Sequence, residues 1–285
     1  MSIERPEAPH GAVLIVGRGR VGRSLIAAFE AAGVEARLRP ARETSGLGAD
    51  AASSSLVLVA VPDAAIEATA ASLAAALAPE VRPSVVHLSG ALGLEVLAPV
   101  AKAGCATGAW HPFQPFASVR PPEAFAGSTI GIESDDPELL ARLEELAGAI
   151  GARPRPIRGE QRALYHAAAM IASAYLVALA AQATDLLSAE LGWEREEALA
   201  ALLPLMEGAV SNLHSEGLPE ALTGPLRRGD AEPIARHVAA LTALDRPATL
   251  DAYRALGREA VELSRSAGLS AEACDALLAA LDADT

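Results

Sequence analysis

The sequence predicts an α/β protein with a doubly wound, mainly parallel sheet, followed by an all-α C-terminal domain. Three observations carry this prediction. Short, apolar, strand-like runs alternate with helix-like segments as far as residue 158. A glycine-rich turn follows the first of these runs directly. Beyond residue 158 the apolar residues recur at helical spacing, and no strand signal remains.

The strand-like runs are short and apolar, as is typical of strands buried on both faces of a sheet. Residues 12–16 read Ala-Val-Leu-Ile-Val, and residues 56–61 form another strong run that ends at Pro62-Asp63. The other expected strands are 34–38, 84–88, 106–110, 128–132 and 153–157. Between them we expect helices over 24–32, 64–77, 93–103 and 137–150, the last opened by the acidic residues and proline of 134–137.

The second half of the chain predicts helices only. From Glu160 to Leu191 apolar residues recur at a period of 3.6 without a strong break, which predicts one helix of about 30 residues. Further helices are expected at 195–203, 204–215, 232–243, 248–267 and 271–281. We therefore expect an N-terminal nucleotide-binding domain of residues 1–158 and a helical domain of residues 159–285 for substrate binding and dimerisation.

The glycine turn has the pattern G-x-G-x-x-G between a strand and a helix. Gly17 permits the tight turn, Gly19 removes a side chain where backbone meets a pyrophosphate, and Gly22 lets helix and strand pack closely. The N-terminus of the following helix offers free N–H groups and a partial positive charge to phosphates. This arrangement predicts a Rossmann-like dinucleotide site. Its loop residues are Gly17, Arg18, Gly19, Arg20, Val21 and Gly22.

Arginines near the second strand favour NADP over NAD as the cofactor. An acid at the end of this strand is typical of NAD sites, whereas arginine there meets the 2′-phosphate of NADP. Here Arg39 and Arg42 follow the strand, and Arg18 and Arg20 add positive charge in the glycine loop. Glu35 comes too early for the NAD role unless the strand boundary shifts by a few residues. The alternative is that these arginines are ordinary solvated charges.

Composition excludes several classes of function. A net charge of −13 argues against non-specific binding of nucleic acid. The first ten residues are polar and lack the apolar core of a signal peptide. The sequence contains no run of about 20 strongly apolar residues, so we expect no membrane span. Cys105 and Cys274 are far apart and have no metal-ligand spacing, so we expect a cytoplasmic protein without a metal site.

Polar residues follow three of the predicted strands, at the sheet edge where α/β proteins bind ligands. Val61-Pro62-Asp63 would line the nicotinamide side of the site, and Ser89 with the Gly90 N–H would bind a substrate carboxylate. His111 lies in the segment 110–116, and histidine exchanges protons near neutral pH. Each histidine here, including His87, has a structural alternative as a satisfied core residue.

The long predicted helix supplies a second set of candidates. Arg162, His166, Met170 and Ser173 are spaced by four, four and three residues, so they share one helix face, and Tyr165 lies next to them. The alternative is a packing face with one satisfied histidine. For the loop 221–230 and for His237, further along the chain, a structural role is the favoured interpretation.

Four segments in order resemble a bacterial family with a Rossmann-like N-terminal domain and a C-terminal helical domain labelled as of unknown function. The segments are His87-x-Ser89-Gly90-Ala91-Leu92, His111-Pro112-Phe113-Gln114-Pro115-Phe116, Tyr165-His166-Ala167-Ala168, and Ala221-Leu222-Thr223-Gly224-Pro225 with Arg228-Gly229-Asp230. The family is similar in plan to the 6-phosphogluconate and β-hydroxyacid dehydrogenases, the ketopantoate reductases and the pyrroline-carboxylate reductases. The resemblance implies NAD(P)-linked reduction of a small carbonyl or imine.

The chain departs from this wider pattern at two positions of the long helix. The dehydrogenase relatives carry a lysine there, which polarises or protonates the carbonyl oxygen, and often an asparagine. Here the residue before Ala-Leu-Tyr-His is Arg162, and Ala174 stands where asparagine is common. Lys102, the only lysine, lies on an earlier helix. Arginine is a poor proton donor, so Arg162 would anchor or polarise the substrate while His166 or His111 supplies the proton.

The function that the sequence favours is NADP-dependent reduction of a small, ketopantoate-like oxo-acid by hydride transfer in an interdomain cleft. The expected catalytic residues are His166, His111, Arg162 and Ser89, and the expected cofactor-binding residues beyond the glycine loop are Arg39, Arg42, Val61, Pro62, Ser89 and Gly90. Two alternatives stay open: an NADP(H)-binding regulatory protein without turnover, and a reductase of cyclic, pyrroline-type imines. A homodimer is expected because the alanine-rich long helix permits close helix approach.

Overall fold

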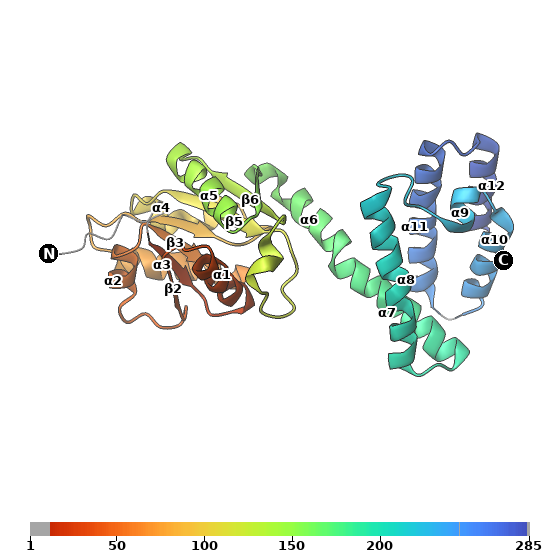
Figure 1. The fold of residues 1–285 in the computed structure, drawn as a ribbon, viewed down its shortest axis with the longest axis horizontal. Helices are drawn as coiled ribbons and strands as arrows, with labels where there is room; N and C mark the ends of the chain where they lie inside the picture. The colour runs from red at the N-terminus through yellow and green to blue at the C-terminus, as the bar shows by residue number, and fades with distance from the viewer. Residues whose placement is uncertain (1–11, 245, 284–285) are drawn as a thin grey trace. The chain divides into compact units, whose positions relative to one another are not determined.

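The computed structural model describes residues 12–244 and 246–283 and divides into two compact units (Figure 1). The first ends at Tyr175 and the second begins at Leu176. This division falls later than residue 158, where the strand signal ends. The reason is that the next helix bonds to the sheet of the first unit through Arg162 and Tyr165.

The first unit is built on a seven-stranded sheet in the order β2-β1-β3-β4-β5-β6-β7. All neighbouring strands are parallel except β5 and β6, which are antiparallel. The doubly wound, mainly parallel sheet expected from the sequence is confirmed. The strands are β1 Val13–Val16, β2 Ala36–Arg39, β3 Leu56–Val59, β4 Ser84–His87, β5 Thr107–Pro112, β6 Thr129–Ser134 and β7 Arg153–Pro156.

Both faces of the sheet are covered, because the central strands β1 and β3 are apolar and buried on both sides. One face packs against α1 Arg20–Ala31 and α5 Pro137–Ala149, around the fully buried Trp110. The Trp110 indole N–H donates to the Leu143 carbonyl at 3.1 Å, which satisfies its polar group inside the core. The other face packs against α2 Leu47–Ala52, α3 Ile66–Ala76 and α4 Ala98–Lys102. Short 3-10 turns lie at Asp63–Ala65, Leu94–Leu97 and Pro122–Phe125.

The predicted single helix over residues 160–191 is interrupted once. A 3-10 turn, Gly159–Gln161, leads into α6 Arg162–Ala172, and α7 Ala174–Leu191 follows after Ser173. Ser173 leaves helical geometry at φ −125° and ψ −72°, while its hydroxyl donates to the Ala169 carbonyl at 2.6 Å. Such back-bonding of serine competes with regular helix geometry.

The segment Gly159–Leu191 is also long and apolar enough to cross a membrane, by length and composition alone. Its most apolar window has a mean hydropathy of 1.7, and none of that window is buried in the structure. The sequence expectation of no such span therefore differs from this finding. Alanine raises the mean hydropathy of the segment without forming a run of large apolar side chains.

The described residues of the second unit form helices joined by loops, with no strand among them. Its elements after α7 are α8 Arg195–Ser215, α9 Gly224–Arg228, α10 Ala231–Thr242, α11 Pro247–Ser266 and α12 Ala271–Asp282. The two helices expected at 195–203 and 204–215 are one, because α8 continues through Pro204. The core joins α10, α11 and α12 around Ile234, Val261, Cys274, Leu277 and Leu281.

Close backbone approach at the glycine turn makes a prediction about folding. A Cβ on Gly22 would lie 2.0 Å from the Gly17 carbonyl oxygen, whereas a Cβ on Gly19 meets nothing within 4 Å. We expect Gly22→Ala to lower the free energy of unfolding of the first unit by about 2 kcal/mol or more. Gly19→Ala, the matched control at a helix N-cap, should cost no more than about 1 kcal/mol. Urea unfolding followed by Trp110 fluorescence in a Trp193→Phe background measures both, and equal losses would contradict the prediction.

Candidate functional site

The loops after β1, β3, β4 and β5 meet at one edge of the sheet and form a pocket of about 490 Å³. This is the edge at which the sequence places the ligand. The lining residues are Gly19, Arg20, Val21, Ala60, Val61, Pro62, Asp63, Leu88 and Phe116. Five predicted cofactor residues (Gly19, Arg20, Val21, Val61 and Pro62) therefore lie together, and we call this cavity the nucleotide pocket.

The glycine loop in this pocket has the shape of a phosphate cradle. Gly17 adopts φ +132°, and a Cβ there would lie 2.1 Å from the Ala60 carbonyl oxygen, so only glycine fits. The space beside Gly19 is open. Helix α1 begins directly after Gly19, with no side-chain cap and no acidic residue in its first turn. Its first N–H groups and its dipole are thus available to an anion such as a diphosphate.

The predicted arginines divide into two kinds. Arg18, Arg20 and Arg42 are exposed and free to meet a phosphate. Arg39 is only 6% exposed, and its guanidinium donates to the Asp50 carboxylate and to the Glu43 and Ser45 carbonyls. Arg39 therefore holds the loop after β2 together, and its expected role as a direct phosphate ligand is not supported by its geometry.

The hydroxyl of Ser89 is fully hydrogen-bonded in the turn after β4. The residue is 5% exposed, and its hydroxyl donates to Asp63 Oδ2 at 2.9 Å while accepting from the N–H groups of Ala91 and Leu92. Its lone pairs and its proton are thus in use, which argues against the predicted catalytic role. The hydroxyl instead ties the turn to Asp63 in the nucleotide pocket, and Gly90 follows in the same turn.

His87 is also structural. It is fully buried, its Nε2 lies 3.2 Å from the Gly93 carbonyl, and its Nδ1 accepts from the Ser89 N–H. Burial, aided by the charge of Arg162, lowers the pKa of His87 to about 4. His87 is therefore neutral at pH 7 and holds the turn that carries Ser89 and Gly90.

Arg162 lies inside the protein and not on a pocket wall. It is 1% exposed; its Nε donates to Glu133 Oε2 at 2.5 Å and its Nη1 donates to the Ser89 carbonyl at 3.1 Å. The side chain joins α6 to β6 and to the turn after β4. Its expected role as a substrate anchor is not supported, because it does not line either pocket of this region.

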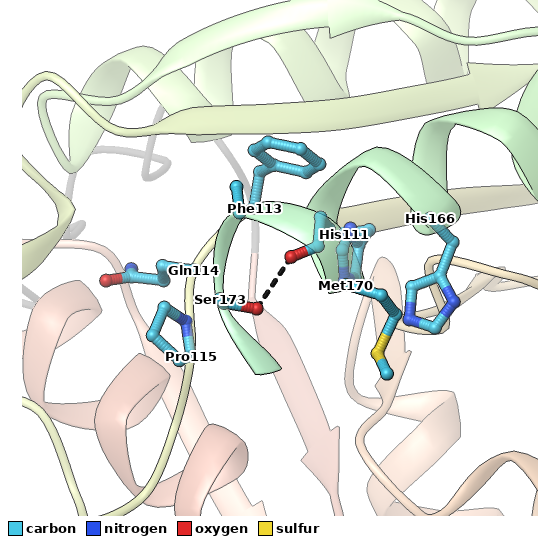
Figure 2. A pocket seen from close by; sticks show the side chains of 9 residues that line it. His111, Phe113, Gln114, Pro115, His166, Met170 and Ser173 are labelled. Carbon is cyan, nitrogen blue, oxygen red and sulfur yellow. Dashed lines mark hydrogen bonds between the residues drawn. The ribbon is translucent and has the colours of Figure 1, made fainter. Parts of the chain in front are cut away.

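A second pocket of about 270 Å³ lies between the segment after β5 and α6 (Figure 2). Figure 2 shows His111, His166 and Met170 close together, with Gln114 and Pro115 across from Ser173. The lining residues are His111, Phe113, Gln114, Pro115, His166, Ala169, Met170, Ala172 and Ser173. We call this cavity the histidine pocket. The histidine pocket lies next to the nucleotide pocket. Pro115 lines the histidine pocket, and the following residue, Phe116, lines the nucleotide pocket.

His111 sits in an aromatic cluster at the base of the histidine pocket. Its Nδ1 lies 2.9 Å from the Tyr165 hydroxyl, and its ring meets Tyr165 edge to face at 5.5 Å between centroids. The ring of His166 is 6.3 Å away. Burial, then the charges of His166 and Arg162, lower the pKa of His111 to about 4. Since the unfolded histidine binds protons nearer pH 6.5, the folded state loses stability as the pH falls from about 6.5 towards 4.

The sequence did not predict the contacts of three residues that shape this region, and one of them, Glu133, was not among the candidates. Asp63 was expected only to line the nicotinamide side, yet it also binds Ser89. Glu133, the partner of Arg162, and Tyr165, the partner of His111, lie 29 and 54 residues from those partners. The position of Tyr165 beside the helix face gave a signal for it, whereas nothing marked Glu133. Within residues 12–244 and 246–283, no group of three or more His, Cys, Asp or Glu side chains could hold a metal ion.

The buried ion pair predicts a large effect on stability. Removing Arg162 leaves Glu133, whose side chain is 15% exposed, without its countercharge. We expect Arg162→Ala to lower the free energy of unfolding of the first unit by about 3 kcal/mol, measured by urea titration with Trp110 fluorescence. Arg158→Ala is the matched control, because its pair with Glu160 is 75% and 74% exposed, and it should cost less than about 0.5 kcal/mol. A small loss for Arg162→Ala would show that the pair does not hold α6 on the sheet.

Comparisons with known proteins agree with this architecture. Residues 5–112 match the model of a Rossmann-like domain, and residues 128–260 match DUF2520, a domain of unknown function. No curated protein matches the chain.

Three solved structures are similar to the chain in fold. A Bacteroides fragilis protein provisionally named an NADP oxidoreductase is 22% identical, with a TM-score of 0.67 over 88% of this chain and 98% of its own. A Thermotoga maritima protein is 24% identical, with a TM-score of 0.66 over 89% and 99%. A Plasmodium falciparum pyrroline carboxylate reductase, solved with NADP bound, is 13% identical, with a TM-score of 0.58 over 95% and 98%. The chain thus matches a Rossmann-like model in its N-terminal part and the DUF2520 model in the part that follows.

Proposed function

We propose that this protein is an NADP-dependent oxidoreductase that reduces a small carbonyl substrate, such as a ketopantoate-like oxo-acid. The observation that carries the proposal is the adjacency of two pockets in the first unit. One has an open glycine cradle at an uncapped helix N-terminus, and the next, sharing the segment Pro115-Phe116, presents two histidines. Similar folds named as an NADP oxidoreductase and as an NADP-bound reductase support it.

The residues of the nucleotide pocket fit a dinucleotide phosphate. The loop Gly17–Gly22 would hold the pyrophosphate, and Val61 and Pro62 would line the nicotinamide side. Arg42, with Arg18 and Arg20, supplies exposed guanidinium groups for the 2′-phosphate. When bound, NADPH supplies the hydride for the reduction.

The histidine pocket would hold the substrate. His111 and His166 lie at its wall and supply a hydrogen-bond donor and a proton for the substrate oxygen. The Gln114 side-chain nitrogen is buried and has no hydrogen-bond partner among the described residues, so a substrate oxygen would satisfy it. Arg162 and Ser89 act indirectly in this proposal. They fix the turn after β4 and the helix α6, which form the walls of the site.

A cyclic imine is the second candidate substrate. The described lining of the histidine pocket contains no lysine or arginine, and an imine needs less polarisation than a carbonyl. The fold is also similar to that of a pyrroline carboxylate reductase. If the missing helix lysine has instead cost the protein its activity, it binds NADP(H) as a regulatory protein.

Cofactor binding and turnover test this function directly. We expect NADPH to bind in a fluorescence titration and to be consumed, by loss of its absorbance, with ketopantoate or another member of a panel of oxo-acids and cyclic imines. Arg42→Ala should raise the Kd of NADPH about tenfold and leave that of NADH nearly unchanged. Arg153→Ala, an exposed arginine on β7 at the opposite edge of the sheet, is the control. Binding without turnover would favour the regulatory alternative, and no binding would contradict the proposal.

We also propose that the protein is a cytoplasmic homodimer whose second copy covers α7 and α8. These helices bury little within their own unit: Thr184 is the buried residue of α7 and Ala198 that of α8. Large apolar side chains are exposed instead, at Leu176, Val177, Leu191, Leu199, Leu203, Leu205, Val210 and Leu213. Apolar surface of this extent marks an interface, and homodimer interfaces are the more apolar kind.

Introducing negative charge on this apolar surface tests the dimer. Val177 and Leu205 are 70% and 71% exposed, so Val177→Glu with Leu205→Glu should leave the fold intact and give a monomer in sedimentation equilibrium. Leu218→Glu, at an equally exposed leucine beyond α8, is the control and should stay dimeric. A wild-type monomer would refute the dimer, and recovery of the protein with pelleted membranes would refute the cytoplasmic placement.

A further inference from the structure

We propose that Tyr165 is a positioning residue that holds His111 as the neutral tautomer with its proton on Nε2. His111 would then serve as an uncharged hydrogen-bond donor to the substrate oxygen or nitrogen, and proton transfer would belong to His166. This inference rests on the proposed reductase function for its chemical meaning, but the tautomer itself is independent of that function.

The contact between the two side chains is specific. Tyr165 extends from α6 to the β5–β6 pair, in which His111 lies opposite Gly131. Its hydroxyl is 2.9 Å from His111 Nδ1. A Cβ on Gly131 would lie 2.6 Å from the same hydroxyl oxygen, so the strand pair has room for Tyr165 only because residue 131 is glycine.

The direction of the hydrogen bond follows from what else the hydroxyl meets. Within residues 12–244 and 246–283 the hydroxyl forms no hydrogen bond other than the one with His111, so its proton has no other acceptor there. Among the described residues, Nδ1 of His111 is the acceptor that this proton reaches. A nitrogen that accepts must be unprotonated, so the proton of the neutral ring is on Nε2.

The surroundings of His111 favour the neutral ring. The groups that face it are His166 and Arg162 on α6, His87 on β4 and Tyr165 itself, while the carboxylate of Glu133 is paired with Arg162. Burial and the neighbouring positive charges lower the pKa of His111 to about 4, and burial raises the pKa of Tyr165 to about 12. With this pKa, about one His111 ring in a thousand is protonated at pH 7. This fraction is too small for His111 to serve as the general acid.

The ring is also fixed in orientation. A Cβ on Gly90 would lie 2.7–3.0 Å from three atoms of the His111 ring, so the backbone of the turn after β4 packs directly against it. Phe113 and Tyr165 pack edge-on to the ring at 6.3 and 5.5 Å between centroids. With Nδ1 bonded to Tyr165, Nε2 is the nitrogen left for a ligand in the histidine pocket.

The division of roles between the histidines has a chemical basis. As hydride adds to a carbonyl carbon, the π electron pair moves to the oxygen, and a donor already aimed at that oxygen stabilises the developing charge. The Nε2–H of His111 would make this bond without giving up its proton. His166 lines the same pocket and is partly exposed, so it would transfer its proton to the oxygen and regain one from water.

Nitrogen NMR of the uniformly 15N-labelled protein tests the tautomer without any assay of activity. Long-range 1H–15N correlations distinguish a protonated from an unprotonated ring nitrogen, and His111→Gln identifies the His111 signals among the six histidines. We expect Nε2 protonated and Nδ1 unprotonated down to about pH 5. In Tyr165→Phe, which keeps the aromatic packing, the tautomer preference should be lost and the pKa of His111 should rise by about one unit.

The second unit provides a matched control. His237 Nδ1 and the Tyr253 hydroxyl are also 2.9 Å apart, with rings edge to face, so Tyr253→Phe removes the same bond elsewhere. This variant should leave the His111 signals unchanged. A proton on Nδ1 in the wild type, or unchanged His111 signals in Tyr165→Phe, would overturn the proposal.

Kinetics then separate this inference from the proposed function. Once a substrate is found, Tyr165→Phe should lower kcat about tenfold or more and change KM and the Kd of NADPH little. An unchanged kcat would overturn the role of Tyr165. If no substrate turns over while the NMR result holds, the reductase function fails and the tautomer assignment stands.

Discussion

The bonds of Arg162 to Glu133 and to the Ser89 carbonyl place helix α6 against the sheet. Without them, the side chains of α6 that line the histidine pocket would depend for their position relative to β5 on the contact of Tyr165 with His111. The planar guanidinium suits this task, because its donors point in fixed directions and meet a carboxylate and a carbonyl at once. A lysine at this position would offer one compact ammonium group in place of that fork. The position at which the family resemblance implies a catalytic lysine is thus occupied, in this chain, by a buried arginine that joins helix and sheet.

Charge is kept away from the histidine pocket. The buried cation of Arg162 is paired behind its wall, and His87 and His111 are neutral at pH 7. The Gln114 amide and the Ser173 hydroxyl, which also line the pocket, are uncharged groups that donate and accept hydrogen bonds. A pocket of this kind recognises its ligand by the direction of hydrogen bonds and by shape more than by net charge. The adjoining nucleotide pocket differs, because exposed arginines border it.

Much of the fold was predictable because it depends on local patterns. The pattern is clearest at β1 and β3, which are short apolar runs that end in turn residues, and the glycine turn joins β1 to α1 as its spacing indicates. The short helix α2 and the continuation of α8 through Pro204 were missed, since six residues carry too little periodicity and proline is normally a strong breaker. The candidate site was predictable in place but only partly in roles. Residue type shows what Arg39 and Ser89 are able to do, but not that Asp50 and Asp63 already bind them.

The hydroxyl of Ser89 links the two pockets through a continuous set of bonds. Asp63, at the wall of the nucleotide pocket, accepts from Ser89, and the carbonyl of Ser89 accepts from Arg162 on α6. If cofactor binding moves Asp63, the strain reaches the helix that carries His166. Thermodynamic linkage then requires the effect to be mutual. A ligand that fixes the position of α6 raises the affinity for the nucleotide by the same factor by which the nucleotide raises the affinity for that ligand. Ser89 would thereby couple the affinities of the two ligands, whichever of them binds first.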